Sequence, residues 1–524
     1  MGKTAARESD SPHARNYSRA ALGLIVLGAA FHLFYSTHLE LVGDEAYYWL
    51  WSRHPDICYL DKGPMIAWLI WLGTALFGQT VFGVRFFAVL LAGGTGWAIF
   101  LLGRRLFSER AAFWAVVIAS VVPLFAVGAS LMTIDTVYIF FWSWAAVAFW
   151  QAKDQIRVAP WVGTGALVGL GLLSKYTAAI ELLSFAAFCL WHRPSRVHFR
   201  RATFWSMTGT AVLFLVPAII WNVHHHWPTS DWLLQRGALD TGVKIHPAFV
   251  FSFLGEQALV VSPLLFAGLF YVLWRRDELR PLQPALTYAA ALFLPLFTLY
   301  LLLSFHYLGP PNWTAAAYVG GIVLLAAGWI ELVATRVWAR RVVVVALLLA
   351  SLETGILLDT RWLHLPHRVD PLDRARGSRR LAAAVAQAKQ KSGARFIIAD
   401  NYMTAALLSF YLPGQPETFV PKVARPLNQL ELWSDYDRKF PRGAALIVSK
   451  KRKVPRRLQR TFTSCRSLGP VKVVDGDRTV GEYHLFIAQR DPEINAPRSV
   501  PIALATRPAA DARPGPQIAH PGRQ

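Results

Sequence analysis

The chain has 524 residues, of which 54% are hydrophobic and only 16% are charged, whereas roughly a quarter of the residues in an average soluble domain are charged. This composition excludes an ordinary soluble protein and predicts a polytopic α-helical membrane protein. The formal net charge is +22, but the basic residues lie in short clusters between apolar segments, which indicates membrane topology and not nucleic-acid binding. The three cysteines exclude a disulfide scaffold and provide no CxxC metal motif.

Apolar segments recur as far as residue 358 and predict about 11 transmembrane helices. A spanning helix needs roughly 20 apolar residues, and helices inside a bundle can be shorter. The predicted crossings are 20–38, 84–102, 112–130, 134–151, 160–173, 176–191, 204–221, 249–273, 284–304, 314–333 and 342–358.

The basic clusters between these segments predict the orientation. They are Lys3/Arg7/Arg15/Arg19, Arg104/Arg105/Arg110, Lys153/Arg157, Arg193/Arg196/Arg200/Arg201, Arg275/Arg276/Arg280 and Arg336/Arg340/Arg341. All of them fall on one side of the membrane, which the positive-inside rule makes the cytoplasm. We therefore expect a cytoplasmic N-terminus without a cleaved signal peptide, and everything after about residue 359 outside.

Two apolar stretches are not predicted to be single transmembrane helices. Segment 64–78 reaches only about 22 Å at 1.5 Å per residue, short of the roughly 30 Å hydrocarbon core, so we expect it to be interfacial or re-entrant. Segment 160–191 has basic clusters at both ends and must cross an even number of times. It is predicted to be a helical hairpin that turns at Ser174-Lys175-Tyr176 on the outer side.

The remainder of the chain predicts a small extracytoplasmic α/β domain. Ser378 is expected to cap a helix that runs to about Lys391, with Gly393 as its stop. Strands are predicted at 395–399, 445–449 and 482–488, and another helix near 402–411. The predicted division is a cytoplasmic tail at 1–19, a transmembrane domain at 20–358, the outer domain at 359–490 and a disordered tail at 491–524.

Acidic residues beside the membrane are the first candidates for a site. The first outer loop, 39–63, contains Asp44 and Glu45 directly after a membrane helix, and Asp61 and Lys62 just before the interfacial segment. These side chains would be held at the level of the lipid headgroups, although a solvated loop is the common alternative. Asp135 lies in a short turn between two apolar helices, where a charge is costly without a partner or an aqueous cavity.

Cations and aromatic residues in the outer loops add further candidates. Arg85 and Lys175 are either snorkelling anchors or, with Lys62, an anion site. Consecutive histidines cannot all face one ion on regular structure, so no metal is predicted at 224–226. Tyr59, Asp61, His226, Asn312 and Trp313 are kept as candidate substrate contacts, and the segment 306–313 is either an aromatic substrate rim or a plain connection.

An ordered set of short motifs carries a family resemblance. The motifs are Asp44-Glu45-Ala46-Tyr47-Tyr48, Asp61-Lys62-Gly63-Pro64, Val84-Arg85-Phe86, Gly103-Arg104-Arg105-Leu106-Phe107, Met132-Thr133-Ile134-Asp135, Leu173-Ser174-Lys175-Tyr176, Pro311-Asn312-Trp313, Ala399-Asp400-Asn401-Tyr402 and Phe410-Tyr411-Leu412-Pro413-Gly414. Together they resemble bacterial glycosyltransferase family 39, of the GT-C membrane glycosyltransferases, from about residue 20 to about 490. That family includes the lipid A aminoarabinose transferase, Rhizobium-type galacturonosyl transferases and protein O-mannosyltransferases.

The resemblance implies roles for individual residues. Asp44 matches the acidic residue assigned to catalysis, with Glu45 beside it, and Lys62 matches the lysine that contacts the carrier phosphate. Asp61 stands where the aminoarabinose transferase has Glu, and Gly63 where many members have Pro or His. These departures leave the reaction class unchanged and the sugar open. The full expectation is a catalytic set of Asp44, Glu45 and Asp135 and a phosphate-binding set of Lys62, Arg85 and Lys175.

The chemistry of such a donor is simple. A sugar on polyprenyl phosphate has a good leaving group, so the enzyme needs cations at the phosphate and a base for the acceptor, for which Asp44 is the candidate. In-line attack opposite the phosphate would invert the anomeric centre. No cofactor is required, although a divalent cation could bridge an acidic residue to the phosphate.

The expected protein is a monomeric inner-membrane glycosyltransferase. It would transfer a hexose- or pentose-type sugar from a polyprenyl phosphate, undecaprenyl phosphate in a bacterium, to lipid A, lipopolysaccharide or another envelope glycan on the outer face, and it would bind no nucleic acid. Three alternatives remain open: transfer to Ser/Thr of secreted proteins, a transporter of lipid-linked sugars, or a sensory domain on a membrane anchor.

Overall fold

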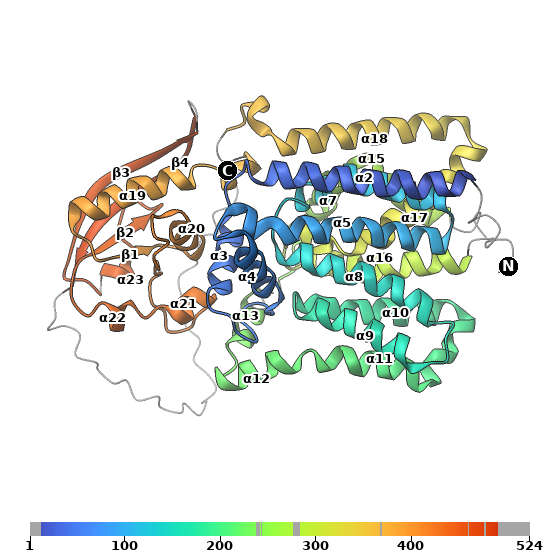
Figure 1. Cartoon of the computed structure of the whole chain (residues 1–524), viewed down its shortest axis with the longest axis horizontal. Helices are drawn as coiled ribbons and strands as arrows, with labels where there is room; N and C mark the ends of the chain where they lie inside the picture. The colour runs from blue at the N-terminus through green and yellow to red at the C-terminus, as the bar shows by residue number, and fades with distance from the viewer. Residues whose placement is uncertain are drawn as a thin grey trace.

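The computed structural model describes residues 12–236, 242, 244–275, 283–366, 369–459, 461–475 and 478–490. Long helices form a bundle, and a smaller domain with a β-sheet lies at one end of it (Figure 1). The predicted tail at 491–524, and residues 1–11 of the predicted N-terminal tail, lie outside the described residues.

Every predicted crossing is helical in the structure. The helices are α2 (Pro12–Ser36), α5 (Val81–Leu106), α6 (Glu109–Val121), α7 (Pro123–Gly128), α8 (Ile134–Ala152), α9 (Val158–Leu172), α10 (Ala179–Trp191), α11 (Ala202–Leu213), α12 (Val216–His224), α14 (Pro247–Val261), α15 (Pro263–Trp274), α16 (Gln283–Ser304), α17 (Ala317–Thr335) and α18 (Val337–Leu358). The short 3-10 helices η1 (Tyr176–Ala178), η2 (Arg193–Arg200) and η5 (Pro311–Thr314) lie in the connections.

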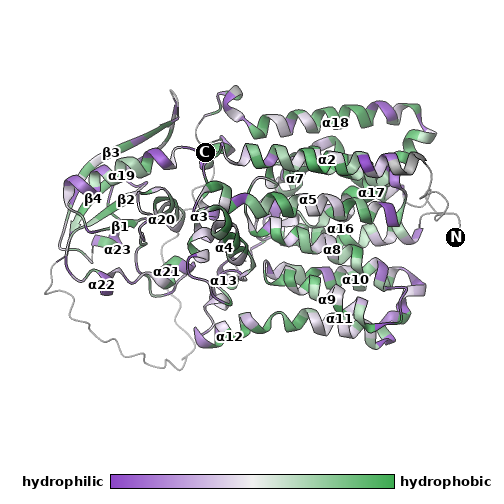
Figure 2. Cartoon of the chain, in the orientation of Figure 1, coloured by the Kyte–Doolittle hydropathy of each residue, from purple (hydrophilic) through white to green (hydrophobic). Residues whose placement is uncertain are grey.

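The apolar character of the bundle confirms a multi-pass membrane protein. Among the described residues, six helices are long and apolar enough to cross a membrane, or up to seven if a bent pair counts as one span. Hydrophobic residues dominate these helices, and polar residues gather at the two ends of the bundle (Figure 2). The helices of the predicted hairpin are apolar but shorter, at 158–172 and 176–191, so the total of eleven crossings stays a prediction.

One predicted crossing is not a single continuous helix. Segment 249–273 forms two helices, α14 and α15, that meet at 107°. Ser262 at the break has φ 81°, and Pro263 disfavours the helical conformation for the residue before it and has no N–H of its own. The predicted crossing at 112–130 is interrupted in the same way at Val122, which precedes Pro123.

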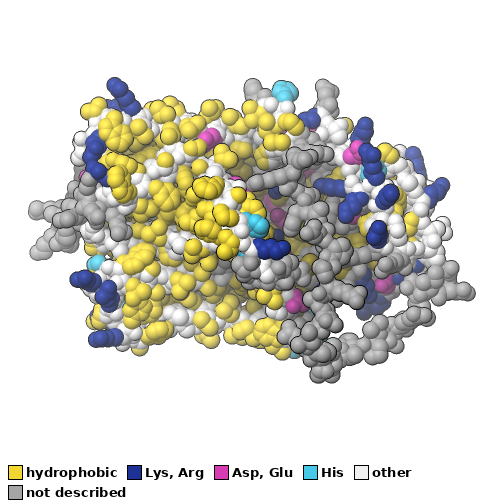
Figure 3. All heavy atoms as spheres, turned by 180° about the vertical axis from the view of Figure 1, so that it is seen from behind, with side chains coloured by type: hydrophobic (Ala, Val, Ile, Leu, Met, Phe, Trp, Pro, Cys, Tyr) yellow, Lys and Arg dark blue, Asp and Glu magenta, His cyan; other side chains and the backbone are white. Residues whose placement is uncertain are grey.

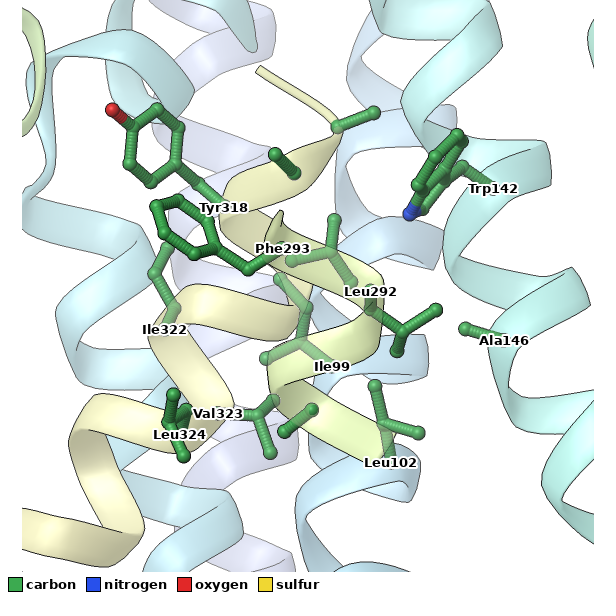
Figure 4. Packing of buried hydrophobic residues seen from close by; sticks show 14 of the residues in the cluster. Ile99, Leu102, Trp142, Ala146, Leu292, Phe293, Tyr318, Ile322, Val323 and Leu324 are labelled. Atoms are coloured by element: carbon green, nitrogen blue, oxygen red, sulfur yellow. The ribbon is translucent and has the colours of Figure 1, made fainter. Parts of the chain in front are cut away.

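The centre of the bundle is a closed hydrophobic core. Leu292 and Phe293 of α16 and Tyr318 of α17 are fully buried, and they pack with residues of α5 and α8 (Figure 4). Gly320 lets α17 approach α16 closely, because a Cβ there would lie 2.6 Å from the carbonyl oxygen of Ala289. Interiors packed in this way resist deformation, so the bundle can hold its outer loops in fixed positions.

The predicted interfacial segment is the helix α4 (Met65–Phe77). It lies with α3 (Gly43–Ser52) between the bundle and the C-terminal domain, and both run across the direction of the long helices (Figure 1). With 13 residues, α4 is too short to span. A broad apolar surface covers the bundle, and basic side chains gather at the end away from the C-terminal domain (Figure 3), as the positive-inside rule expects of a cytoplasmic side.

The C-terminal domain is a four-stranded sheet with helices. Its elements are η6 (Thr360–Leu363), η7 (Pro371–Ala375), α19 (Ser378–Ser392), β1 (Phe396–Ala399), α20 (Tyr402–Tyr411), α21 (Gln429–Trp433), α22 (Tyr436–Lys439), β2 (Ala445–Ser449), α23 (Arg456–Gln459), β3 (Ser464–Asp475) and β4 (Arg478–Gln489). The strand order is β1-β2-β4-β3. Strands β1 and β2 are parallel, and the other neighbours are antiparallel. The small α/β domain is therefore present, with the three predicted strands and the helix at 402–411.

Two details of this domain differ from the predictions. Strand β3 is not among the predicted strands, because most of its residues are exposed and a bulge at Ser467/Gly469 interrupts it. The prediction that Ser378 caps its helix is wrong. Its backbone N–H instead donates to Glu40 Oε2 at 2.5 Å, so a carboxylate of the first outer loop caps α19. Gly393 ends the helix as predicted, with φ 67°.

Candidate active site

Asp44 lies where the membrane part meets the C-terminal domain. It occupies the first turn of α3, and its Oδ1 accepts a hydrogen bond from the Tyr402 hydroxyl of α20 at 3.4 Å. Burial raises the pKa of Asp44, and Lys62 is the largest of the influences that lower it. A carboxylate in this environment is a stronger base than one in water, which suits the role predicted for it.

Glu45 and Arg85 form a fully buried ion pair. Arg85 donates from Nε to Glu45 Oε1 at 2.8 Å and from Nη2 to Glu45 Oε2 at 2.5 Å. Its remaining donors reach the carbonyl oxygens of Ser36, Leu39 and Glu40. All five N–H groups of the guanidinium are therefore used, and both side chains are fully buried.

This geometry argues against the predicted roles of these two residues. Arg85 has no donor left for a carrier phosphate, and Glu45 also accepts from the backbone N–H groups of Val42 and Met132. The pair fixes the start of α3 to α5 and to the turn before α8. Glu45 and Arg85 are therefore engaged with each other and with the backbone around the start of α3, which carries Asp44.

Asp135, Lys175 and Asn312 meet at one end of the bundle, although they are far apart in sequence. Lys175 Nζ donates to Asp135 Oδ1 at 2.7 Å, and Asn312 Nδ2 donates to Asp135 Oδ2 at 2.5 Å. The predicted hairpin turn, the start of α8 and the segment 306–313 thus converge on one carboxylate. Asp135 has the partners that a charge in such a turn requires.

Buried Gln257 of α14 holds the segment that carries Asn312. Its Nε2 donates to the carbonyl oxygen of Pro311 at 3.0 Å. Its Oε1 accepts from Thr314 at 2.6 Å and from Tyr318 at 2.9 Å. Asn312 therefore sits on a fixed support and not on a plain connection between helices.

Lys62 is the cation best suited to bind an anion. Its ammonium lies 3.9 Å from the ring centre of Trp232, and no ion pair joins it to any residue in the described ranges. The pKa of Lys62 is lowered to about 8, chiefly by burial; the neighbouring Asp61 opposes this shift, and the positive charges of Lys175 and Arg236 contribute to it. Cations that repel one another in this way are stabilised by an anion placed between them.

Arg236 is a residue of this site that the sequence predictions missed. It ends α13 (Pro228–Arg236), and its guanidinium lies 5.2 Å from the ring centre of Trp313. It is close enough to influence the charges of Asp44 and Lys62. In the predicted topology Arg236 lies in an outer loop, where the positive-inside rule does not expect an arginine. That exception is the sequence signal that could have pointed to it.

Asp61 is fixed beside Lys62 by an aromatic residue of α3. Tyr47 Oη donates to Asp61 Oδ1 at 3.2 Å, and burial raises the pKa of Asp61 to about 6. Tyr59 is structural: its hydroxyl donates to the carbonyl oxygens of Trp51 and His54, and its ring stacks on Trp51 at 4.4 Å. The phenol is thus engaged by the backbone of its own loop.

The histidines of the loop after α12 stand apart from the other candidates. His226 is exposed with φ 60°, and no contact in the described part of the chain joins it to Asp44, Lys62 or Asp135. Searched over the described residues, no group of three or more His, Cys, Asp or Glu side chains could hold a metal ion. Metal independence remains a prediction.

Known proteins match this arrangement in part of the sequence and in the fold. Residues 61–221 match the family model described as dolichyl-phosphate-mannose-protein mannosyltransferase. Lipid A galacturonosyltransferase RgtD of Rhizobium johnstonii is 25% identical over 54% of this chain and 59% of its own length. An undecaprenyl phosphate-alpha-4-amino-4-deoxy-L-arabinose arabinosyl transferase of Pseudomonas fluorescens Pf-5 is 28% identical over 50% of this chain and 49% of its own.

A solved structure shows the same fold. ArnT from Cupriavidus metallidurans bound to undecaprenyl phosphate aligns with a TM-score of 0.60 and 19% identity, covering 88% of this chain and 98% of that one. The apo form of ArnT gives a TM-score of 0.57. The resemblance predicted from the motifs is thereby confirmed, while the chain spans less than two thirds of the length of the curated relatives that it matches.

Proposed function

We propose that this protein is a membrane glycosyltransferase that takes a sugar from a polyprenyl-phosphate donor. The observation that carries the proposal is the position of Asp44, a partly buried carboxylate beside the cationic group of Lys62, Lys175 and Arg236. The names of the two sequence relatives, which describe sugar transfer to lipid A and from undecaprenyl phosphate, support it.

The proposed mechanism assigns one task to the Asp44 carboxylate and another to the cations. Lys62 and Arg236 neutralise the carrier phosphate as it leaves, with Lys175 held nearby by Asp135. Charge stabilisation of this kind is worth most in a site shielded from water. Asp44 removes the proton from the acceptor as it attacks the opposite face of the sugar, so the anomeric centre inverts.

Lipid A or lipopolysaccharide is the acceptor that we favour, and undecaprenyl phosphate the carrier. The sugar is of the hexose or pentose type, because the relatives are named for galacturonic acid and for an aminoarabinose. The acceptor site faces the outside of the inner membrane in this proposal, with the N-terminus in the cytoplasm. Transfer to Ser/Thr of secreted proteins is the second candidate, favoured by the description of the matching family model.

The test is transfer by purified protein. Undecaprenyl-phosphate-linked sugars are supplied one at a time with lipid A or with a peptide rich in Ser and Thr, and mass spectrometry follows the released carrier and the modified acceptor. Asp44→Asn is the inactive control, expected to lose about a hundredfold or more in turnover. Movement of the donor across vesicles without transfer would indicate a transporter and contradict the proposal. Envelope glycolipids of deletion and parent strains identify the natural acceptor.

A further inference from the structure

Tyr402 brings the C-terminal domain into contact with the candidate base. It begins α20 directly after Asn401, whose side chain accepts a hydrogen bond from Thr404 N at 2.9 Å and so fixes the start of the helix. The Tyr402 ring packs on Tyr47 with ring centres 4.7 Å apart. Across the described ranges, its hydroxyl makes the one hydrogen bond that the Asp44 side chain receives.

Close packing between α20 and α3 sets this position. A Cβ on Gly43 would lie 2.5 Å from Met403 Cβ, so the two helices touch at the residue before Asp44. At the other end of α20, Tyr411 Oη accepts a hydrogen bond from Leu41 N at 2.7 Å. The domain therefore holds the start of α3 on both sides of the candidate base.

A second connection lies beside the first. Tyr47 Oη, which donates to Asp61, accepts a hydrogen bond from Gln429 N of the C-terminal domain at 2.6 Å. Gln429 Oε1 in turn accepts from Leu60 N at 2.7 Å. The loop that carries Asp61 and Lys62 is thus also attached to this domain.

We propose that Tyr402 is a positioning residue for Asp44, through which the C-terminal domain orients the carboxylate and stabilises its charged form. The active site is then complete only with this domain docked against α3. The inference rests on the function proposed above, because it takes Asp44 as the base of the transfer.

The electrostatics of Asp44 agree with this role. Burial raises its pKa, while Lys62, the Tyr402 hydroxyl, Arg374 and Arg236 lower it. Asp61 and Tyr48 also face it, the first as a like charge. A hydroxyl that donates to a carboxylate favours the charged form. The 3.4 Å separation is long, and catalytic hydrogen bonds often shorten only when substrate binds.

The test compares two tyrosines of the same helix. Tyr402→Phe keeps the ring against Tyr47 and removes only the hydroxyl, so the acid limb of the kcat/KM profile should move to higher pH by about 0.5–1 unit. The loss of activity should be about three- to tenfold on that limb, and most of it should be recovered at higher pH. Tyr411→Phe also removes a hydrogen bond between the C-terminal domain and the segment before α3, but this hydrogen bond does not involve Asp44. Tyr411→Phe should therefore leave the acid limb of the kcat/KM profile unchanged.

A spectroscopic measurement tests the effect of Tyr402 on Asp44 without depending on enzyme activity. Infrared difference spectra between the wild type and Asp44→Asn isolate the Asp44 carboxylate band, which should titrate at higher pH in Tyr402→Phe. An unchanged titration in Tyr402→Phe, or an equal shift in Tyr411→Phe, would overturn the proposal. If the wild type transfers no sugar from any donor, the proposed function fails, whereas the infrared titration still tests whether Tyr402 controls Asp44.

Discussion

Lys62 and Arg85 are both basic residues of the motifs that carry the family resemblance. Their surroundings in the fold nevertheless give them different roles. All five N–H groups of Arg85 are bound to Glu45 and to backbone carbonyls. The Lys62 ammonium instead lies over the Trp232 ring, and the charges of Lys175 and Arg236 lower its pKa. The motifs could indicate that both residues matter. They could not tell a residue that binds an anion, as proposed for Lys62, from a residue in a buried ion pair, such as Arg85. The difference lies in contacts with residues that are distant in sequence.

The charge of Lys62 should make donor capture depend on pH. Burial lowers its pKa to about 8. Its ammonium is charged below that pH and neutral above it, so on the alkaline side of the profile kcat/KM for the donor should fall as pH rises through about 8. Lys62→Arg, which keeps its charge, should abolish this fall.

Lys62→Ala is the companion measurement, made on donor affinity. It should weaken donor binding by about ten- to a hundredfold at pH 7, because a charge-assisted hydrogen bond contributes roughly 1.5–3 kcal/mol. Unchanged donor affinity in Lys62→Ala would remove it from the phosphate site.

Arg85→Ala should instead fail by unfolding. It leaves the Glu45 carboxylate buried without its partner, which costs about 3–5 kcal/mol. We expect lower yield and a lower melting temperature, with residual folded protein that still binds donor. A fully stable Arg85→Ala variant with weak donor binding would return Arg85 to the phosphate site.

At the scale of elements, the first outer loop rests directly on the turn of the hairpin. Met65 N donates to the Leu173 carbonyl oxygen at 3.1 Å, and a Cβ on Gly63 would lie 2.0 Å from that oxygen. Gly63→Ala should therefore push Lys62 away from Lys175 and reduce donor binding at least tenfold, a displacement of about 1 Å being enough for large kinetic losses.

The matched control for this substitution is Gly163→Ala in α9, where nothing lies within 4 Å of the added Cβ. Alanine should be neutral or slightly stabilising there, since it is the better helix former. Donor affinity and melting temperature are compared for both variants. Full donor affinity in Gly63→Ala would show that this close approach does not position Lys62.

The accuracy of the element predictions followed the strength of the local signals. The turn predicted at 174–176 follows the end of α9 at Leu172 and includes Tyr176, the first residue of η1; the basic clusters at both ends of 160–191 were the signal for it. The break at Ser262 was missed, although Pro263 marks it, since the apolar run is long enough for one span. The contact of Asn312 with Asp135 joins residues 177 positions apart, and no local pattern could report it.

For the whole molecule, the ends of the bundle differ in a way that fixes the expected orientation. The C-terminal domain lies at one end of the bundle, and basic side chains also mark the far end of the bundle, beyond the apolar surface (Figure 3). The outer domain was predictable as an α/β unit from its alternation of strands and helices. Its contact with Asp44 through Tyr402 was not, because the hydroxyl reaches across a domain boundary.

This orientation predicts which surface positions a membrane-impermeant thiol reagent can reach in intact cells. Lys391 in the C-terminal domain and Arg196 in η2 are both exposed, and they lie at opposite ends of the bundle in this interpretation. In a background with all three native cysteines replaced, Lys391→Cys should be labelled from outside. Arg196→Cys should be labelled only after the membrane is permeabilised, because the cluster around it belongs to the cytoplasmic side. Labelling of Arg196→Cys in intact cells would reverse the topology and place Asp44 and Lys62 in the cytoplasm.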